Sequence, residues 1–249
     1  MTKIGIIGGS GLDNPELFKA ASDRIVDTPY GRPSSSLKEG LIGEAGVVLL
    51  ARHGREHEIT PTQVNYRANI HALKDAGCTH IIATTAVGSL REEIGRGDFV
   101  ILDQFIDFTR HRSLTFYDSF EPGKAVHTGM ADPFDAELRA ALITTAKELE
   151  LDFHPDGTVV TIEGPRFSTR AESNMFRMWG ADVVNMSIAS EAILANEAGI
   201  PYAAIAMSTD YDCWKNDEAP VSWEDILKVF SGNVEKMTEL LGAVIKKIS

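Results

Sequence analysis

The sequence predicts an α/β fold formed by one domain, residues 1–249. Short β-branched runs alternate with helical segments along the whole chain, as an α/β sheet requires. No stretch resembles a linker, a low-complexity tract or an internal repeat that would divide the chain. Hydrophobic residues make up 43% and charged residues 24%, which is the balance of an ordinary globular domain.

Seven short runs are predicted as strands, because β-branched and apolar residues are concentrated in them. They cover residues 4–7, 47–51, 80–84, 99–105, 158–162, 183–186 and 203–207.

Five segments are predicted as helices from their apolar spacing and their end signals. They cover residues 64–76, 135–149, 169–180, 191–198 and about 222–248. Gly77 and Gly199 stand where helices commonly end. Thr169 and Glu172 fit a capping box, and Ser222 is placed to cap the last helix.

The charge and cysteine content exclude several classes of protein. Lys and Arg number 24 against 36 Asp and Glu, which gives a net charge of −12 and disfavours a nucleic-acid or anionic-membrane partner. Cys78 and Cys213 are far apart and form no C-x-x-C pair, which excludes a disulfide scaffold and a zinc ribbon. We see no signal-peptide pattern and no apolar run of membrane-spanning length, so we expect a cytoplasmic protein.

A glycine-rich stretch, residues 8–11, follows the first predicted strand. Backbone N–H groups in such a loop can point at a phosphate, and Ser10 is its one side chain suited to donate a hydrogen bond. A dinucleotide fingerprint fails, because Asn14 stands where the third glycine belongs, and no Walker A lysine follows. A phosphate site and a plain turn remain equal alternatives for this loop.

Arg52 and His53 follow the second predicted strand and combine a guanidinium fork with an imidazole. Both groups suit a phosphate dianion, so anion binding is favoured over a surface Arg–carboxylate pair. Residues 53–57 also match the H-x-x-E-H pattern of zinc proteases. We interpret that match as chance, because Gly54 and Pro61 disfavour the helix that the pattern needs.

Further polar groups follow other predicted strands. Residues 84–89 are predicted as a loop rich in hydroxyl groups, and Ser187 follows the strand at 183–186. Strand-end loops are where open α/β sheets collect ligands, so these anion candidates reinforce one another. Asp210 and Asp212 follow the strand at 203–207, where a solvated loop and a functional acid remain open alternatives and a metal site is less favoured.

Seven stretches, taken in order, resemble the 5′-methylthioadenosine phosphorylases of the trimeric purine nucleoside phosphorylase family. The resemblance runs from residue 4 to about residue 230. The stretches are residues 4–12, 51–54, 65–69, 85–93, 163–168, 179–186 and 208–214.

The resemblance implies a twisted, mixed β-sheet flanked by helices, and phosphorolysis of an N-glycosidic bond. It implies no metal and no cofactor, since inorganic phosphate is a co-substrate. It also implies a homotrimer or a dimer of trimers. The phosphate site that it implies consists of Ser10, Arg52, His53, Thr85, the Ala86 N–H and Ser187.

The resemblance also assigns the groups around the nucleoside. Asp210 would be the general acid at purine N7, oriented by Ser168, and Asp212 would accept from the 6-amino group. Two Asp residues would favour adenine over a 6-oxopurine. Phe167 would pack on the purine and Met186 along the ribose.

The pocket for the 5′ group is implied at the start of the last helix. Trp223, Ile226 and Leu227 occupy those positions, and His127 would reach in from a neighbouring subunit. Trp223 replaces a smaller aliphatic residue, residues 187–190 replace a threonine-led stretch with proline, and the chain ends before a C-terminal extension of longer relatives. Phosphorolysis is expected despite these departures, whereas strict preference for a methylthio group does not follow.

Two alternatives remain open from the sequence. One is a phosphorylase for 5′-methylthioinosine or other 6-oxopurine nucleosides. The other is a nucleoside-binding protein without turnover, which Asp210, Arg52 and His53 disfavour.

Overall fold

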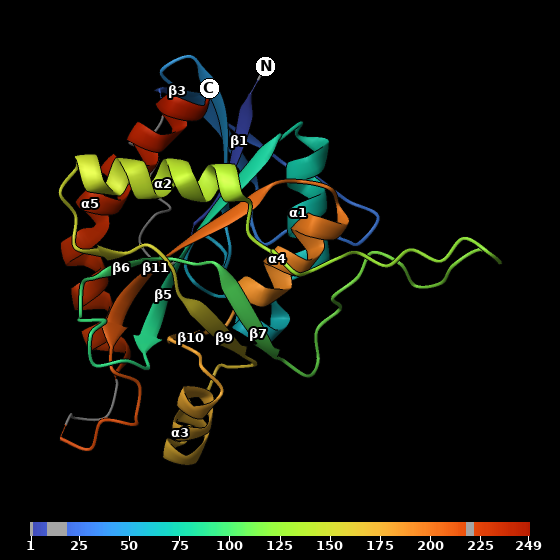
Figure 1. The fold of residues 1–249 in the computed structure, drawn as a ribbon. Helices are drawn as coiled ribbons and strands as arrows, with labels where there is room; N and C mark the ends of the chain where they lie inside the picture. The colour runs from blue at the N-terminus through green and yellow to red at the C-terminus, as the bar shows by residue number, and fades with distance from the viewer. Residues whose placement is uncertain (1, 9–18, 218–221) are drawn as a thin grey trace.

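The computed structural model describes residues 2–8, 19–217 and 222–249, and its described strands all join one mixed sheet. Helices cover both faces of this sheet (Figure 1). The strands are β1 (Lys3–Gly8), β2 (Lys19–Arg24), β3 (Leu37–Ile42), β4 (Ala45–Ala51), β5 (His80–Ser89), β6 (Phe99–Ile101), β7 (Gln104–Phe108), β8 (Phe153–His154), β9 (Thr158–Ile162), β10 (Val183–Asn185) and β11 (Tyr202–Asp210).

Strand β5 joins two branches of the sheet. The main path runs β2-β3-β4-β1-β5-β10-β9-β7, and β11 pairs with both β5 and β6. The first residues of β5 pair in parallel with β1, whereas Gly88 and Ser89 at its end pair with β10 in antiparallel fashion. Along its other edge β5 pairs with β11. The carboxyl ends of β4, β5, β10 and β11 therefore lie near one another.

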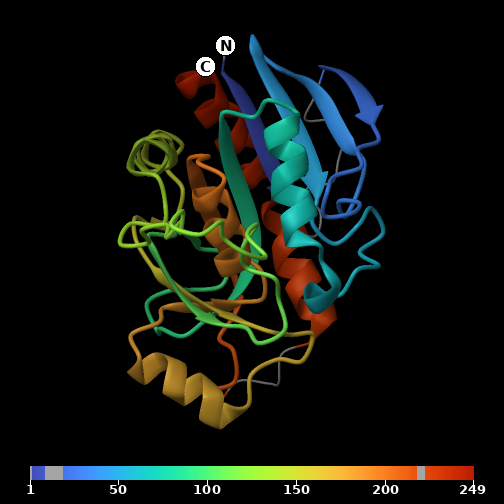
Figure 2. The same ribbon diagram turned by 90° about the vertical axis from the view of Figure 1, so that its right-hand side faces the viewer.

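The core has two main layers because each sheet face is covered by a pair of helices. On one face pack α1 (Tyr66–Asp75) and α4 (Ile188–Glu197), and on the other α2 (Ala136–Glu148) and α5 (Trp223–Ile248). The side chains of strand β1 alternate between these two layers. Ile4 and Ile6 pack on the side of α2 and α5, and Ile7 packs on the side of α1 and α4. Helix α3 (Arg170–Met178) lies at the opposite end of the molecule from the two chain ends (Figure 2).

The predicted helix signals are confirmed. Thr169 and Glu172 form a complete capping box on α3, and the Ser222 hydroxyl accepts from the Asp225 N–H at the start of α5. Helices α1 and α4 end just before Gly77 and Gly199, both of which have positive φ. Helix α4 begins at Ile188, three residues earlier than predicted.

Several strand predictions need correction. Residues 84–89 and 208–210 belong to β5 and β11 instead of loops, because pairing between these two strands continues to Gly88 and Asp210. The predicted strand at 99–105 is two strands, since β6 pairs with β11 and β8 whereas β7 pairs with β9. Strands β2, β3 and β8 were not predicted, because β2 and β3 are polar and β8 has two residues.

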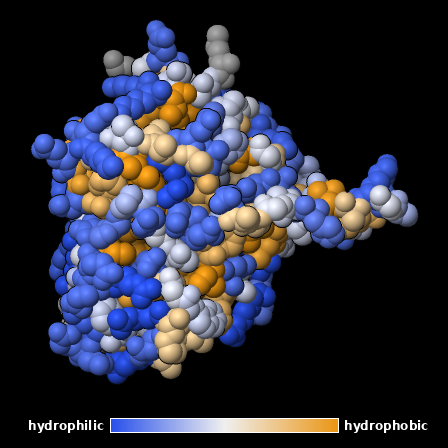
Figure 3. All heavy atoms as spheres, viewed as in Figure 1, coloured by the Kyte–Doolittle hydropathy of each residue, from blue (hydrophilic) through white to orange (hydrophobic). Residues whose placement is uncertain are grey.

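A long arm between β7 and α2 extends away from the body (Figures 1 and 3). Its residues 109–135 contain no helix or strand, and they include the exposed apolar side chains Tyr117, Phe120 and Val126. Within the described part of the chain, no helix combines the length and the apolar character needed to cross a membrane.

Candidate active site

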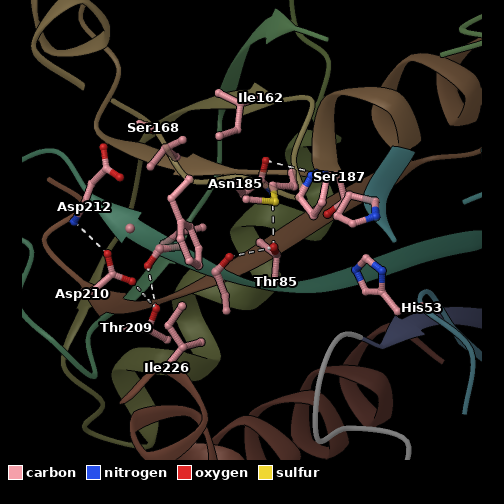
Figure 4. A pocket seen from close by; sticks show the side chains of 18 of the residues that line it. His53, Thr85, Ile162, Ser168, Asn185, Ser187, Thr209, Asp210, Asp212 and Ile226 are labelled. Carbon is pink, nitrogen blue, oxygen red and sulfur yellow. Dashed lines mark hydrogen bonds between the residues drawn. The ribbon is translucent and has the colours of Figure 1, made fainter. Parts of the chain in front are cut away.

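A cavity of about 270 Å³ opens where β4, β5, β10 and β11 end. Its wall includes polar side chains from each of these strands or from the residue that follows (Figure 4). Asp210 and Asp212 lie at one end of the view, and His53 and Ser187 lie at the other. The strand-end position agrees with where open α/β sheets bind ligands.

Arg52 follows the last residue of β4 and is 1% exposed. Its guanidinium donates two hydrogen bonds to the Glu191 carboxylate and one, of 2.9 Å, to the Thr84 carbonyl. The Tyr202 hydroxyl donates to the same carboxylate at 2.8 Å. Burial alone would lower the pKa of Arg52, but the charge and hydrogen bonds of Glu191 raise it above its usual value. The pair places a permanently charged, fixed guanidinium at the cavity wall.

His53 is held in one tautomer by its own loop. Its Nδ1 lies 2.9 Å from the Ile59 carbonyl oxygen, which can only accept, so Nδ1 carries the proton. Burial, followed by the positive charge of Arg52, lowers the pKa of His53 to about 3. The imidazole is therefore neutral at physiological pH. Its ring packs against His57 with centroids 4.5 Å apart.

A hydrogen-bonded chain connects β9, β10 and β5 behind the cavity. The Thr161 hydroxyl donates to Asn185 Oδ1 at 2.8 Å, and Asn185 Nδ2 donates to Thr85 Oγ1 at 3.3 Å. The Ser187 N–H donates to the same Asn185 oxygen at 3.4 Å. Asn185 thus fixes two of the groups predicted to hold phosphate, Thr85 and Ser187.

Asp210 is buried and accepts two hydrogen bonds. The Thr209 hydroxyl donates to Oδ2 at 2.8 Å, and the Asp212 N–H donates to Oδ1 at 2.7 Å. Burial raises the pKa of Asp210 to about 6, from an ordinary value of 3.8, although both hydrogen bonds oppose the rise. Burial also raises the pKa of Asp212, against the effect of the Ser173 and Ser168 hydroxyls.

Gly88 permits these two carboxyl groups to approach β5 closely. A Cβ atom at this position would lie 3.0 Å from Asp210 Oδ1 and 3.2 Å from Asp212 Cβ. A side chain there would require both neighbours to shift by a few tenths of an ångström, so a glycine suits the close spacing of the acid end.

Two predicted roles change in the structure. Ser168 lines the cavity beside Asp212, and Asp210 is oriented by Thr209 and the Asp212 backbone instead. Ile226 lines the cavity, but Leu227 is 39% exposed and does not. Residues 223, 226 and 227 have the i, i+3, i+4 spacing of one helix face, so the assignment of Leu227 to the 5′ pocket stays a prediction.

The other predicted residues are placed as follows. Phe167, Met186 and Ala86 line the cavity, whereas His127 is exposed on the arm. Ser10 and the side chain of Trp223 lie outside the described residues. Groups of three or more His, Cys, Asp or Glu that could hold a metal ion are absent from the described residues.

Glu191, Asn185 and Thr209 are functional candidates that sequence reasoning missed. A signal was present for Glu191, the one charged residue between Ile188 and Leu194, because an acid in an apolar helix needs a buried partner. Asn185 and Thr209 resemble ordinary strand residues. Thr85, which accepts from Asn185, is 100 residues away, whereas Thr209 donates to its chain neighbour Asp210.

Comparison with known proteins gives one consistent answer. A model of the family described as the phosphorylase superfamily matches residues 3–246. The S-methyl-5′-thioadenosine phosphorylase of Xenopus tropicalis is 57% identical over 99% of this chain and 89% of its own length. That of Aedes aegypti is 55% identical over 99% of this chain and 89% of its own length.

Solved structures agree with these relatives. A methylthioadenosine phosphorylase from Schistosoma mansoni in complex with adenine has a TM-score of 0.95 and 45% identity, covering 100% of this chain and 92% of that one. A mutant adenosine/methylthioadenosine phosphorylase from the same organism, in complex with methylthioadenosine, has a TM-score of 0.93 and 45% identity over the same shares.

Proposed function

The chain belongs to the phosphorylase superfamily, and on that premise we propose how its cavity works as an enzyme site. The reaction is phosphorolysis of 5′-methylthioadenosine to adenine and 5-methylthioribose 1-phosphate. One observation supports this function above the others. A single cavity is lined both by Asp210, a buried acid with a raised pKa, and by a set of groups suited to bind an anion.

The acid end of the cavity serves the departing base. As the C1′–N9 bond breaks, negative charge develops on adenine, and a proton delivered to N7 removes it. Asp210 supplies that proton, because burial keeps its carboxyl protonated to a higher pH than an exposed Asp would be. Thr209 and the Asp212 N–H hold the carboxyl in one orientation.

Asp212 determines which base is accepted. Its carboxylate would accept a hydrogen bond from the 6-amino group of adenine, while a 6-oxo group in the same place would present oxygen to oxygen. The Ser168 and Ser173 hydroxyls lie near Asp212 and oppose the rise of its pKa. We assign Phe167 to the purine face and Met186 to the ribose, since both line the cavity.

The other end of the cavity holds phosphate, whose oxygen attacks C1′ as the base leaves. We assign Arg52, His53, Thr85, the Ala86 N–H and Ser187 to it, with Ser10 from outside the described residues. Preorganised donors of this kind stabilise charge in the transition state without reorganising. Phosphate is a co-substrate here, and we propose that no metal or cofactor takes part.

We also propose that the active form is a homotrimer or a dimer of trimers. The arm is exposed on the single chain, and Tyr117, Phe120 and His127 form an aromatic cluster on it. In this proposal a neighbouring subunit covers the cluster, and His127 reaches that subunit's 5′ pocket near Ile226. Both cysteines are free thiols, which suits the reducing cytoplasm that we propose as its location.

Adenine release by the purified protein tests the function. Methylthioadenosine, adenosine and methylthioinosine are each incubated with and without phosphate, and the freed bases are separated and quantified. We expect phosphate-dependent release that is fastest with methylthioadenosine. Turnover of methylthioinosine alone would overturn the base assignment, and binding without any turnover would identify a nucleoside-binding protein instead.

A further inference from the structure

The phosphate end of the cavity contains a hydrogen-bond acceptor among its donors. His53 and Ile59 are joined by two hydrogen bonds, from the Ile59 N–H to the His53 carbonyl at 2.9 Å and between His53 Nδ1 and the Ile59 carbonyl at 2.9 Å. The side chain is thereby locked to its own loop. Nδ1 is used by that loop, so Nε2 is the ring nitrogen left for a ligand in the cavity that His53 lines.

The surroundings keep a second proton off this ring. The charged and titratable groups that act on His53 are Arg52, Arg112 and His57, and each is cationic or becomes so on protonation. The buried carboxylate of Glu191 accepts hydrogen bonds from Arg52 and Tyr202. Together with burial, this explains the low pKa of His53, about 3. Nε2 therefore keeps its lone pair, on a ring that lines the cavity.

Building on the proposed function, we propose that His53 makes the site selective for a protonated oxyanion, with Nε2 accepting the hydrogen bond of a P–OH group. Monohydrogen phosphate and monohydrogen arsenate each carry one such hydroxyl near neutral pH. Sulfate and monofluorophosphate have a similar size and charge but carry none. A bare oxyanion oxygen facing the Nε2 lone pair would be repelled and left without a hydrogen bond.

This assignment also fixes which oxygen reacts. The protonated oxygen, the weakest nucleophile of the four, is turned toward His53, and an unprotonated oxygen is left to form the bond to C1′. The charges balance: neutral nucleoside, HPO₄²⁻ and protonated Asp210 give the sugar phosphate monoanion, neutral adenine and ionised Asp210. The P–OH proton stays on phosphate throughout, so His53 orients the nucleophile and does not transfer a proton.

Anion binding to the full chain at pH 7.5 tests the proposal without any substitution. Calorimetric titrations with phosphate, arsenate, sulfate and monofluorophosphate are compared. We expect phosphate and arsenate to bind alike, and sulfate and monofluorophosphate to bind at least about tenfold more weakly, as expected for one lost hydrogen bond to a charged group. Equal affinity for all four anions would overturn the proposal.

Variants then test whether His53 is the source of the preference for phosphate over sulfate. In His53→Gln the amide can donate as well as accept, so the preference for phosphate over sulfate should fall to about threefold or less. His80→Gln is the matched control, since His80 lies at the opposite end of β5, and it should keep the wild-type preference. Unchanged selectivity in a folded His53→Gln would contradict the role of Nε2.

The same samples separate this proposal from the proposed function. Adenine release from methylthioadenosine is measured alongside the titrations. Selective phosphate binding without adenine release would overturn the function alone. Adenine release with unselective anion binding would overturn the role of His53 alone.

Discussion

At the residue scale, the chemistry depends on how a carboxyl group is buried. Asp210 is 8% exposed and its pKa is raised to about 6, whereas an ordinary Asp titrates near 4. A carboxyl group that keeps its proton closer to neutral pH is a more effective general acid there. The adjacent backbone N–H of Asp212 and the Thr209 hydroxyl contribute orientation, and they limit how far the pKa rises.

Replacing Asp210 by its amide should abolish proton transfer to the base and leave the shape of the cavity unchanged. In Asp210→Asn we expect kcat for methylthioadenosine to fall by about 100-fold or more, because the amide has no acidic proton. Methylthioinosine turnover should rise relative to methylthioadenosine, since an amide N–H can pair with a 6-oxopurine. Asp217→Asn, at an exposed Asp, is the control and should leave both rates unchanged. Near wild-type cleavage of methylthioadenosine by Asp210→Asn would remove Asp210 from the role of acid.

The same substitution should reveal the elevated pKa through stability. The folded protein binds the Asp210 proton more tightly than the unfolded chain does, so the contribution of Asp210 is fully present below about pH 4 and is lost as the pH rises through about 6. The two pKa values differ enough for a loss of roughly 3 kcal/mol. Asp210→Asn avoids that loss, so its free energy of unfolding should exceed the wild-type value at pH 8 and match it near pH 4. Urea titrations at both pH values measure this, and a difference independent of pH would contradict it.

At the element scale, one ionic cluster ties three elements together beside the proposed phosphate end. Arg52 follows β4, Glu191 lies in the first turn of α4, and Tyr202 begins β11. A buried ion pair contributes little net stability, but losing one partner leaves the other charge uncompensated. The cluster therefore makes the position of Arg52 dependent on helix α4.

Removing Glu191 alone should destabilise the fold, whereas removing both Arg52 and Glu191 should restore much of the lost stability. We expect Glu191→Ala to lower the free energy of unfolding by about 3–5 kcal/mol. Combining Arg52→Met with Glu191→Leu should recover most of that stability and still abolish phosphate-dependent turnover. Urea unfolding and adenine release measure the two effects, with the exposed Glu44→Ala as control. A double variant that remained active would show that Arg52 is structural only.

The strand interiors and helix caps were predictable, because apolar periodicity and capping residues are local signals. The ends of β5 and β11 were not, since residues 84–89 and 208–210 are rich in hydroxyl and small residues that suit loops equally well. Pairing between these two strands decides their conformation. The Arg52–Glu191 contact joins residues 139 apart, and sequence alone gives no means of finding such a partner.

At the scale of the whole molecule, the arm is the feature that a single chain does not explain. Phe120 is 43% exposed and packs only against neighbours on the arm, Tyr117 and His127, among the ring contacts of the described residues. An exposed aromatic cluster on an extended segment favours burial by another subunit. The proposed trimer would also complete each 5′ pocket.

A charge placed in this cluster should prevent assembly. In analytical ultracentrifugation we expect the wild type to have three or six times the 27.1 kDa mass of one chain. We expect Phe120→Asp to have the mass of a single chain. Turnover of methylthioadenosine should fall in the variant, mainly through a higher KM. Leu41→Asp, on β3 at a distance from the arm, is the control and should sediment like wild type. A monomeric wild type with full activity would contradict the trimer.

Strand β5 pairs with β11 up to Gly88, with a register shift on β11 between Ser208 and Asp210, and this pairing has a consequence for the size of the substrate. Thr85 stands at the proposed phosphate end and Gly88 beside Asp210, three residues apart on one extended strand. A strand advances about 3.3 Å per residue, so the backbone separates these two ends by about 10 Å. A loop could stretch or shorten that interval, whereas a strand paired with its neighbours cannot. With the proposed assignments, the separation between nucleophile and proton donor is set by this length of backbone. Inserting one residue between Thr85 and Gly88 would change how far every later side chain reaches and the sheet face on which it lies.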